Sequence, residues 1–341
     1  MATLKFVIKR LLYAVFGLLG LSVFIFVVSR ILPGDPARIA LGPRAPEWAV
    51  EQLREQLHLN DPIPKQYGIW LVNALRGDFG ESLYTRRPVM EDIKEFLPAT
   101  AQLVLLAALI QVFFGILLGI IAGRRRNTWI DNITRVFAYM GVATPAFVIG
   151  ILLLLLFGFV FNLLPTTGQL TAGVTRPPVV TNMILFDSLI AGNFAAFFDN
   201  LKHMILPAIS ICLAGMAQLA RITRVTVGEN LRKEYIFASR GYGVPEWRIA
   251  LKYLLKPSLI PPVSLLGMQI GALFSNAFLV ELVFNWPGFS RYGVNVMLRK
   301  DLNAIAAVAL LMGAIYITMN LLVDFGVGAL DPRVRLGQRS A

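Results

Sequence analysis

The chain has 341 residues, of which 56% are hydrophobic and only 15% charged, and its formal net charge is +12. A soluble domain carries about 25% charged residues, so this composition excludes an ordinary soluble protein and predicts a membrane protein with several spans. The positive charge lies between apolar runs and not on one hydrophilic surface, which argues against nucleic-acid binding. One cysteine and two separated histidines exclude an internal disulfide and a zinc motif.

Six uncharged runs approach the length of about 20 apolar residues that a helix needs to cross a bilayer core of about 30 Å. They predict an all-α polytopic membrane protein with six transmembrane helices. The first follows basic residues without a small-residue cleavage site, so we expect a retained helix and not a signal peptide. The runs are Leu11–Ser29, Phe96–Gly123, Val136 to about Leu164, His203–Ala220, Pro257–Val280 and Leu302–Val323.

Lysine and arginine residues gather in alternate connections between these runs, which predicts that both termini are cytoplasmic. Between the termini, residues 1–10 and 331–341, we expect a first transmembrane helix at 11–32. An external loop at 33–95 and a five-helix domain at 96–330 follow. That domain is expected to contain a second external loop at 165–202 and a cytoplasmic segment at 229–256.

The first external loop reads as a small folded cap, because its acidic and basic residues nearly balance. The stretch Pro46–Leu57 has helical periodicity with Trp48, Leu53 and Leu57 as its apolar set. A second helix is expected at Gln66–Leu75. The cap either recognises a partner or is only a folded spacer, and the sequence leaves both open.

The second external loop contains an apolar patch, Met183–Phe198, that Asp187, Gly192 and Asn193 interrupt. The patch is too broken to span a bilayer. It is expected to lie on the membrane surface or to line an entrance, and the sequence does not separate these two.

Two rows of small residues recur at four-residue spacing within the spans: Gly115, Gly119 and Gly123, then Gly267, Gly271 and Ser275. Small residues at this spacing allow helix backbones to approach closely. The rows indicate packing within the chain or an interface with a partner subunit, and the two are compatible.

The polar segment 229–256 is the most informative part of the sequence. A helix can run through Glu234–Arg240, and Gly241 and Gly243 then allow a turn with positive φ. Pro245 suits the first position of a second helix, on which Arg248, Lys252 and Lys256 form a basic stripe.

Acids and amides near the spans are candidate functional groups, because polar groups in a membrane are costly. Glu281 is either a gate that attracts an ammonium group or half of a structural ion pair, for example with Arg291. For Asp324 a structural or interfacial role is favoured. The amides could line a polar path or form interhelical hydrogen bonds; they are Gln102, Gln111, Gln218 and Gln269.

The sequence contains no phosphate-binding Gly-x-x-x-x-Gly-Lys-[Ser/Thr] motif, and no glycine is followed by lysine. An energised transporter built on this chain would therefore need separate nucleotide-binding subunits. The role that remains for segment 229–256 is mechanical coupling, because a polar helix fixed to two spans can transmit a movement. The rival interpretation is an amphipathic loop that rests on anionic lipid.

The segment that ends in Leu259-Ile-Pro261 resembles the cytoplasmic coupling loop of bacterial ABC importer permeases. In that family a Glu-Ala-Ala core precedes a glycine; the matching positions here are Phe237, Ala238 and Ser239 with Gly243, and the Glu is absent. Further motifs resemble the B-type subunit of the dipeptide/oligopeptide branch. They are Leu32–Pro36, Arg76–Gly80, Leu97–Thr100, Glu281–Gly288, Leu321–Asp324 and Asp331–Arg333.

This resemblance implies a type I ABC importer permease fold in a bacterial inner membrane, with a helical external loop after the first span. The implied partners are a homologous second permease, two cytoplasmic ATPases, an extracytoplasmic substrate-binding protein and the lipid bilayer. ATP and magnesium would be used by the partners, and no cofactor by this chain. The residues expected to couple to an ATPase are Glu234, Tyr235, Phe237, Ala238, Ser239, Arg240 and Gly243.

The polar and small residues described above supply the other expectations. Glu281, Gln218 and Gln269 are candidates for the translocation path or gate, and Gly115, Gly119, Gly267, Gly271 and Asp324 for helix packing or the permease interface. The expected cargo is a di- or oligopeptide, with a nickel chelate or an oligosaccharide as alternatives inside the family. A stand-alone ion-coupled transporter or a membrane scaffold is the alternative outside it.

Overall fold

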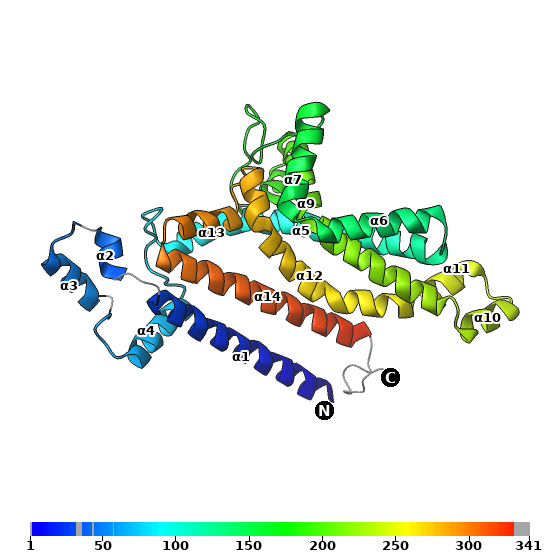
Figure 1. Ribbon diagram of the computed structural model, residues 1–341, viewed down its shortest axis with the longest axis horizontal. Helices are drawn as coiled ribbons and strands as arrows, with labels where there is room; N and C mark the ends of the chain where they lie inside the picture. Colours follow the sequence, from blue (N-terminus) through cyan, green and yellow to red (C-terminus); the bar gives the residue numbers. More distant parts are fainter. Residues whose placement is uncertain (1, 32–35, 43, 57, 331–341) are drawn as a thin grey trace.

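The computed structural model describes residues 2–31, 36–42, 44–56 and 58–330. Over these residues the fold is helical, with one isolated bridge between Glu81 and Pro88. Long helices lie side by side along the long axis of the molecule (Figure 1). Three of the sequence features, Leu57, most of Leu32–Pro36 and the C-terminus with Asp331–Arg333, fall outside the described residues.

Five described helices are long and apolar enough to cross a membrane, and a sixth span results if one bent helix pair counts as one. The all-α, six-span prediction is confirmed in this form. Two of these spans coincide with α5 (Val89–Arg124) and α9 (Phe194–Asn230), and two lie within α1 (Ala2–Ile31) and α14 (Leu302–Leu330). The fifth includes α12 (Lys256–Val283).

The third predicted span is broken and not a single helix. It consists of α6 (Trp129–Ala143) followed by α7 (Ala146–Leu153) and the π-helical η1 (Leu154–Val160), and the two parts meet at 111°. A proline disfavours the helical conformation at the residue before it, and Thr144 before Pro145 is extended, with φ −98° and ψ 127°. The Thr144-Pro145 dipeptide therefore explains the break.

The fourth and fifth spans are longer than their apolar runs. α9 begins at Phe194, where the Asn193 side chain accepts a hydrogen bond from the backbone of Ala196 at 3.1 Å. The apolar patch thus becomes α8 (Ile184–Ile190) and the first turns of α9. Likewise α11 (Glu246–Arg248) and η2 (Ile249–Leu255) continue into α12, so the expected second helix of the inner segment is not separate from the fifth span.

The segment predicted to be the first external loop folds into α2 (Pro36–Leu41), α3 (Glu47–Gln56) and α4 (Ile63–Leu75). The two expected helices are present, and α4 starts at Ile63 because Pro62 takes the N-cap position. Trp48 is 71% exposed, so it does not form an apolar contact face within α3. α4 instead meets α1, where the Tyr67 hydroxyl lies 2.8 Å from that of Ser22 and the ring packs edge-on against Phe26.

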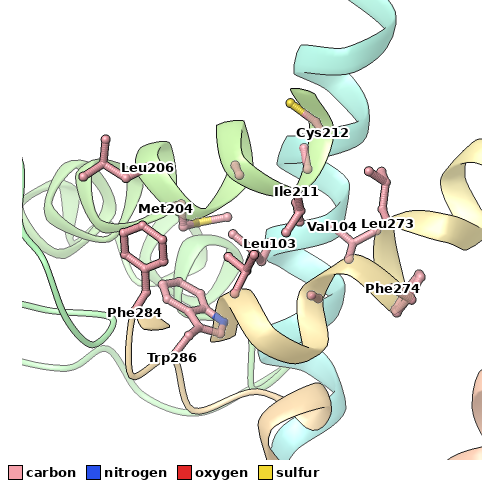
Figure 2. Packing of buried hydrophobic residues seen from close by; sticks show 14 residues of the cluster. Leu103, Val104, Met204, Leu206, Ile211, Cys212, Leu273, Phe274, Phe284 and Trp286 are labelled. Carbon is pink, nitrogen blue, oxygen red and sulfur yellow. The ribbon is translucent and has the colours of Figure 1, made fainter. Parts of the chain in front are cut away.

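The central core joins α5, α9, α12 and the connection that follows α12. Figure 2 shows Trp286 and Phe284 from that connection beside Met204 of α9 and Leu103 of α5. A short helix, α13 (Phe289–Leu298), then leads to α14.

The two glycine rows face helices of the same chain. A methyl group added at Gly119 would lie 2.7 Å from the carbonyl oxygen of Ala220 on α9, and one at Gly115 would lie 3.0 Å from Leu219. Gly267 and Gly271 approach α14, and a methyl group at Gly271 would clash with the ring of Tyr316. Both rows therefore allow close helix packing within this chain.

Candidate functional site

The segment 229–256, predicted to be cytoplasmic, contains a short helix, α10 (Glu234–Gly241), at one end of the molecule. Figure 1 shows it at the opposite end of the long axis from α2 and α3, on the side where α1 begins and α5 meets α6. α9 leads into it and α11 leads out of it, so α10 is attached at both ends to helices long enough to cross the membrane.

The exit from α10 is a glycine turn. Gly243 has φ +71°, and its N–H donates to the carbonyl of Arg240 at 2.9 Å. The N–H of Val244 donates to the carbonyl of Ser239 at 3.1 Å. These bonds close the helix end as in a left-handed C-terminal cap, while Gly241 is still helical. Pro245 then stands at the N-cap of α11, one position before the first helical position expected for it.

One side-chain bond holds each end of α10. The Arg240 Nε donates to Glu246 Oε1 at 2.7 Å, which joins α10 to α11 across the turn. At the start of α10, the Tyr235 hydroxyl donates to Asn230 Oδ1 at 3.1 Å. Partial burial raises the pKa of the Tyr235 phenol above its usual value, so the donor stays protonated. Glu234 is exposed in the first turn of the helix.

Ile236 anchors α10 to the rest of the protein. It is fully buried against Val227 of α9 and against Ile249 and Leu254 of η2. Sequence reasoning missed it, because Tyr235, Ile236 and Phe237 are consecutive and point in directions about 100° apart on a helix. The pattern shows that only one of them can face inward, but it does not say which.

The outward face of α10 presents a largely exposed aromatic side chain. Phe237 is 59% exposed, Ala238 beside it is exposed, and the hydroxyl of Ser239 is bonded back to the carbonyl of Tyr235 at 2.7 Å. Trp247, in the first turn after the glycine exit, is exposed as well. A rigid short helix with a projecting ring and small neighbours can enter a groove on a second protein.

At the other end of the fifth span, Glu281 lies in a closed polar cluster. Its carboxylate is fully buried and accepts hydrogen bonds from Thr100 Oγ1 at 2.5 Å and from the Arg291 backbone N–H at 2.8 Å. The Thr100 oxygen in turn accepts from the Phe289 N–H at 2.7 Å, and the Trp286 indole donates to the carbonyl of Ala99 at 3.0 Å. The cluster fixes the connection between α12 and α13 against α5.

The expected ion pair of Glu281 with the Arg291 side chain is replaced by this backbone contact. The Arg291 guanidinium donates instead to the carbonyl of Asn285 at 3.3 Å. The backbone N–H groups at the start of a helix are donors that a carboxylate can satisfy, which explains why the contact forms at the start of α13.

The remaining candidates are spread along the spans. Gln269 accepts from Gln111 Nε2 at 2.7 Å between α12 and α5, and both side chains are buried. Gln218 is half-buried on α9. Asp324 pairs with Arg10 at 2.6 Å and so joins α14 to α1. None of these lies close enough to Glu281 in the described contacts to form one site with it.

A buried ion pair joins α6 to α9 and had no counterpart in the sequence prediction. Arg224 donates through Nε and Nη2 to the carboxylate of Asp131, the second bond at 2.7 Å, and Asp131 is fully buried. The Asn127 backbone N–H also donates to Asp131 at 2.9 Å. Among the described residues, no cluster of three or more histidine, cysteine or acidic side chains could hold a metal ion.

Comparison with known proteins places these features in one family. Residues 115–336 match the family described as "Binding-protein-dependent transport system inner membrane component", and residues 3–104 match the corresponding N-terminal family. The chain is 37% identical over 318 residues to the "Probable D,D-dipeptide transport system permease protein DdpB" of Escherichia coli K12, which covers 93% of this chain and 94% of that protein.

Two further relatives align over almost their full length. The chain is 33% identical to the "Dipeptide transport system permease protein DppB" of Alkalihalophilus pseudofirmus over 97% of this chain and 99% of the relative. It is 35% identical to the "Glutathione transport system permease protein GsiC" of Escherichia coli K12 over the same shares.

Proposed function

The chain belongs to the family of inner membrane components of binding-protein-dependent transport systems, and from this we propose that it is the B-type permease subunit of an importer of small peptides. The peptide substrate class is supported by three relatives at 33–37% identity, each of which is named as a permease for a dipeptide or for glutathione. A nickel chelate or an oligosaccharide remains the alternative cargo inside the family.

A multi-pass inner membrane protein follows from the family and from the apolar helices. Both termini are proposed to be cytoplasmic, with residues 33–95 and the second loop outside and α10 inside. The excess of lysine and arginine at the end that carries α10 and the loop between α5 and α6 supports this orientation.

The chain is proposed to contain no ATPase site of its own, since it lacks a Gly-x-x-x-x-Gly-Lys motif. ATP and magnesium then act in partner ATPases, two of which would bind the inner side. A homologous second permease would complete the membrane domain, and a substrate-binding protein would dock outside. The proposed ATPase contact is α10 with its glycine exit, namely Glu234, Tyr235, Phe237, Ala238, Ser239, Arg240 and Gly243.

The coupling mechanism follows from how α10 is attached. Ile236 and the Arg240–Glu246 pair fix α10 to both α9 and the start of the fifth span, so a displacement of α10 moves both helices together. An ATPase that binds α10 differently with and without ATP shifts the population between inward-open and outward-open states. Glu281, Gln218 and Gln269 remain proposals for the path or gate.

Reconstitution tests the function. The permease is assembled in vesicles with its partner permease, ATPases and binding protein, and ATP hydrolysis is measured with a panel of solutes. We expect dipeptides and oligopeptides to stimulate hydrolysis. Stimulation by a nickel chelate or an oligosaccharide alone would exclude the peptide assignment, and transport by the permease without ATPases would exclude the importer.

Cross-linking tests the contact at α10. The single cysteine, Cys212, is fully buried, so a cysteine introduced on the surface is the reactive one. Phe237→Cys is expected to cross-link to an ATPase in the assembled transporter. Trp48→Cys, on the loop proposed to be external, is the matched control and should not cross-link, although Trp48 is even more exposed (71%) than Phe237 (59%). An ATPase cross-link from both positions, or from neither, would remove α10 as the specific contact.

A further inference from the structure

A basic pocket of about 220 Å³ opens between α6 and α9. α6 contributes Thr134, Arg135, Ala138 and Tyr139, and α9 contributes Arg221, Arg224 and Val225. The role proposed above for the chain uses none of these residues, and none of them belongs to α10 or to the Glu281 cluster.

The pocket carries positive charge that its own lining does not neutralise. Arg224 is already bound by the buried carboxylate of Asp131. Arg135 and Arg221, one from each helix, are exposed, and their lining neighbours include no acidic residue. Arg135 donates to the neutral amide oxygen of Asn132 and also feels the Asp131 carboxylate, so three guanidinium groups are set against this one acidic group. The pocket therefore attracts an anion that can lie between two guanidinium groups.

The depth of the two arginines fits the level of lipid phosphates. The apolar run 203–220 ends directly before Arg221 and is about 27 Å long at 1.5 Å per residue, close to the hydrocarbon thickness of about 30 Å. Arg135 lines the same pocket as Arg221 and so stands at about the same level. Both side chains thus fall where the hydrocarbon ends and the headgroups begin.

The surface beside the pocket is suited to acyl chains. On the pocket wall itself the Tyr139 ring is 64% exposed and Val225 is 37% exposed. The opposite face of α6 presents further large apolar side chains, Ile133, Val136 and Met140. A soluble phosphate would gain nothing from this surface, whereas a phospholipid would use both the charge and the apolar area. Basic pockets between membrane helices on the cytoplasmic side are suited to anionic headgroups.

We propose that this pocket binds the phosphate headgroup of an anionic phospholipid in the inner leaflet. The headgroup lies between Arg135 and Arg221 and links α6 to α9, next to the Asp131–Arg224 pair that joins the same helices. The leaflet assignment rests on the proposed orientation, but binding itself is measured without transport and so fails or succeeds separately from the importer function.

Spin-labelled lipids test the site in the assembled transporter, reconstituted in phosphatidylcholine vesicles with a minor fraction of labelled phosphatidylglycerol or phosphatidylcholine. The readout is the motionally restricted fraction of each label. The wild type should prefer phosphatidylglycerol, and Arg135→Gln and Arg221→Gln should each lower that preference about fivefold, since a basic residue near the surface contributes about 1 kcal/mol. Arg221→Lys, which keeps the charge, should retain most of the preference.

The matched control removes two other arginine charges, from the neighbouring loop between α5 and α6. Arg124 and Arg125 are exposed and lie outside the pocket, so Arg124→Gln with Arg125→Gln should leave the preference nearly unchanged. An equal loss in this control would mean diffuse surface attraction and would overturn the site. So would the absence of any preference in the wild type, or displacement of the labelled lipid by inorganic phosphate.

Discussion

Replacing Gly243 by proline is expected to reduce peptide-stimulated ATP hydrolysis by the assembled transporter to below about a tenth of the wild-type value. Gly243 has φ +71° and donates its N–H to the carbonyl of Arg240. Proline fixes φ near −65° and has no N–H, so the exit from α10 cannot keep its shape. A conformational mismatch of this kind costs about 1–3 kcal/mol, and about 1.4 kcal/mol is already a factor of ten in an equilibrium constant.

The fold should survive the same change. No atom outside the immediate chain neighbours lies within 4 Å of a Cβ placed at Gly243, so the substitution disturbs the direction of α10 and not the core. Membrane insertion and association with the partner permease, measured by co-purification, are therefore expected to stay intact. Normal stimulation in Gly243→Pro would refute the coupling role.

Two further substitutions distinguish the effect of the backbone conformation at Gly243 from the effect of adding a side chain. Gly241→Ala is the matched control, because Gly241 is helical and a Cβ there meets open space; it should behave as wild type. Gly243→Asn should retain most of the stimulation, because asparagine adopts positive φ more easily than other residues with a side chain. Equal loss in Gly241→Ala and Gly243→Pro would mean that the strained turn is not the cause.

The spans could be predicted from the sequence because a bilayer imposes length and apolarity on each helix separately. The ends of the helices could not be predicted from hydropathy, because the helices continue through polar residues beyond their apolar runs, as at Phe194 and at Glu246. The proline after Thr144 indicates the break in the helix. A hydropathy profile does not detect this break, because the residues on both sides are uncharged.

The sites depended on contacts between distant residues, which spacing does not encode. Thr100 and Glu281 are 181 positions apart, and Asp131 and Arg224 are 93 apart. Leu97–Thr100 and Glu281–Gly288 were recognised as separate motifs, and the structure brings them together through Thr100, Ala99 and Trp286. The inner segment was easier, because Gly243 and Pro245 determine its turn locally.

Glu281→Ala is expected to destabilise the permease by about 2–6 kcal/mol, because two buried donors lose their acceptor at about 1–3 kcal/mol each. These donors are the Thr100 hydroxyl and the Arg291 N–H. Glu281→Gln keeps one acceptor oxygen and should cost less. The apparent melting temperature of the purified permease measures both effects.

The same pair of variants separates the two interpretations of Glu281. In the first interpretation the carboxylate mainly fixes the start of α13 against α5. Glu281→Gln then lowers the amount of folded permease, and total peptide-stimulated ATP hydrolysis falls with it. The molecules that remain folded still respond to peptide normally. If Glu281 instead attracts the ammonium group of a peptide at a gate, then Glu281→Gln stays stable and loses stimulation. Full burial and saturation by neutral donors favour the first outcome. Asp324→Ala is the control, since its pair with Arg10 is partly exposed and should contribute less.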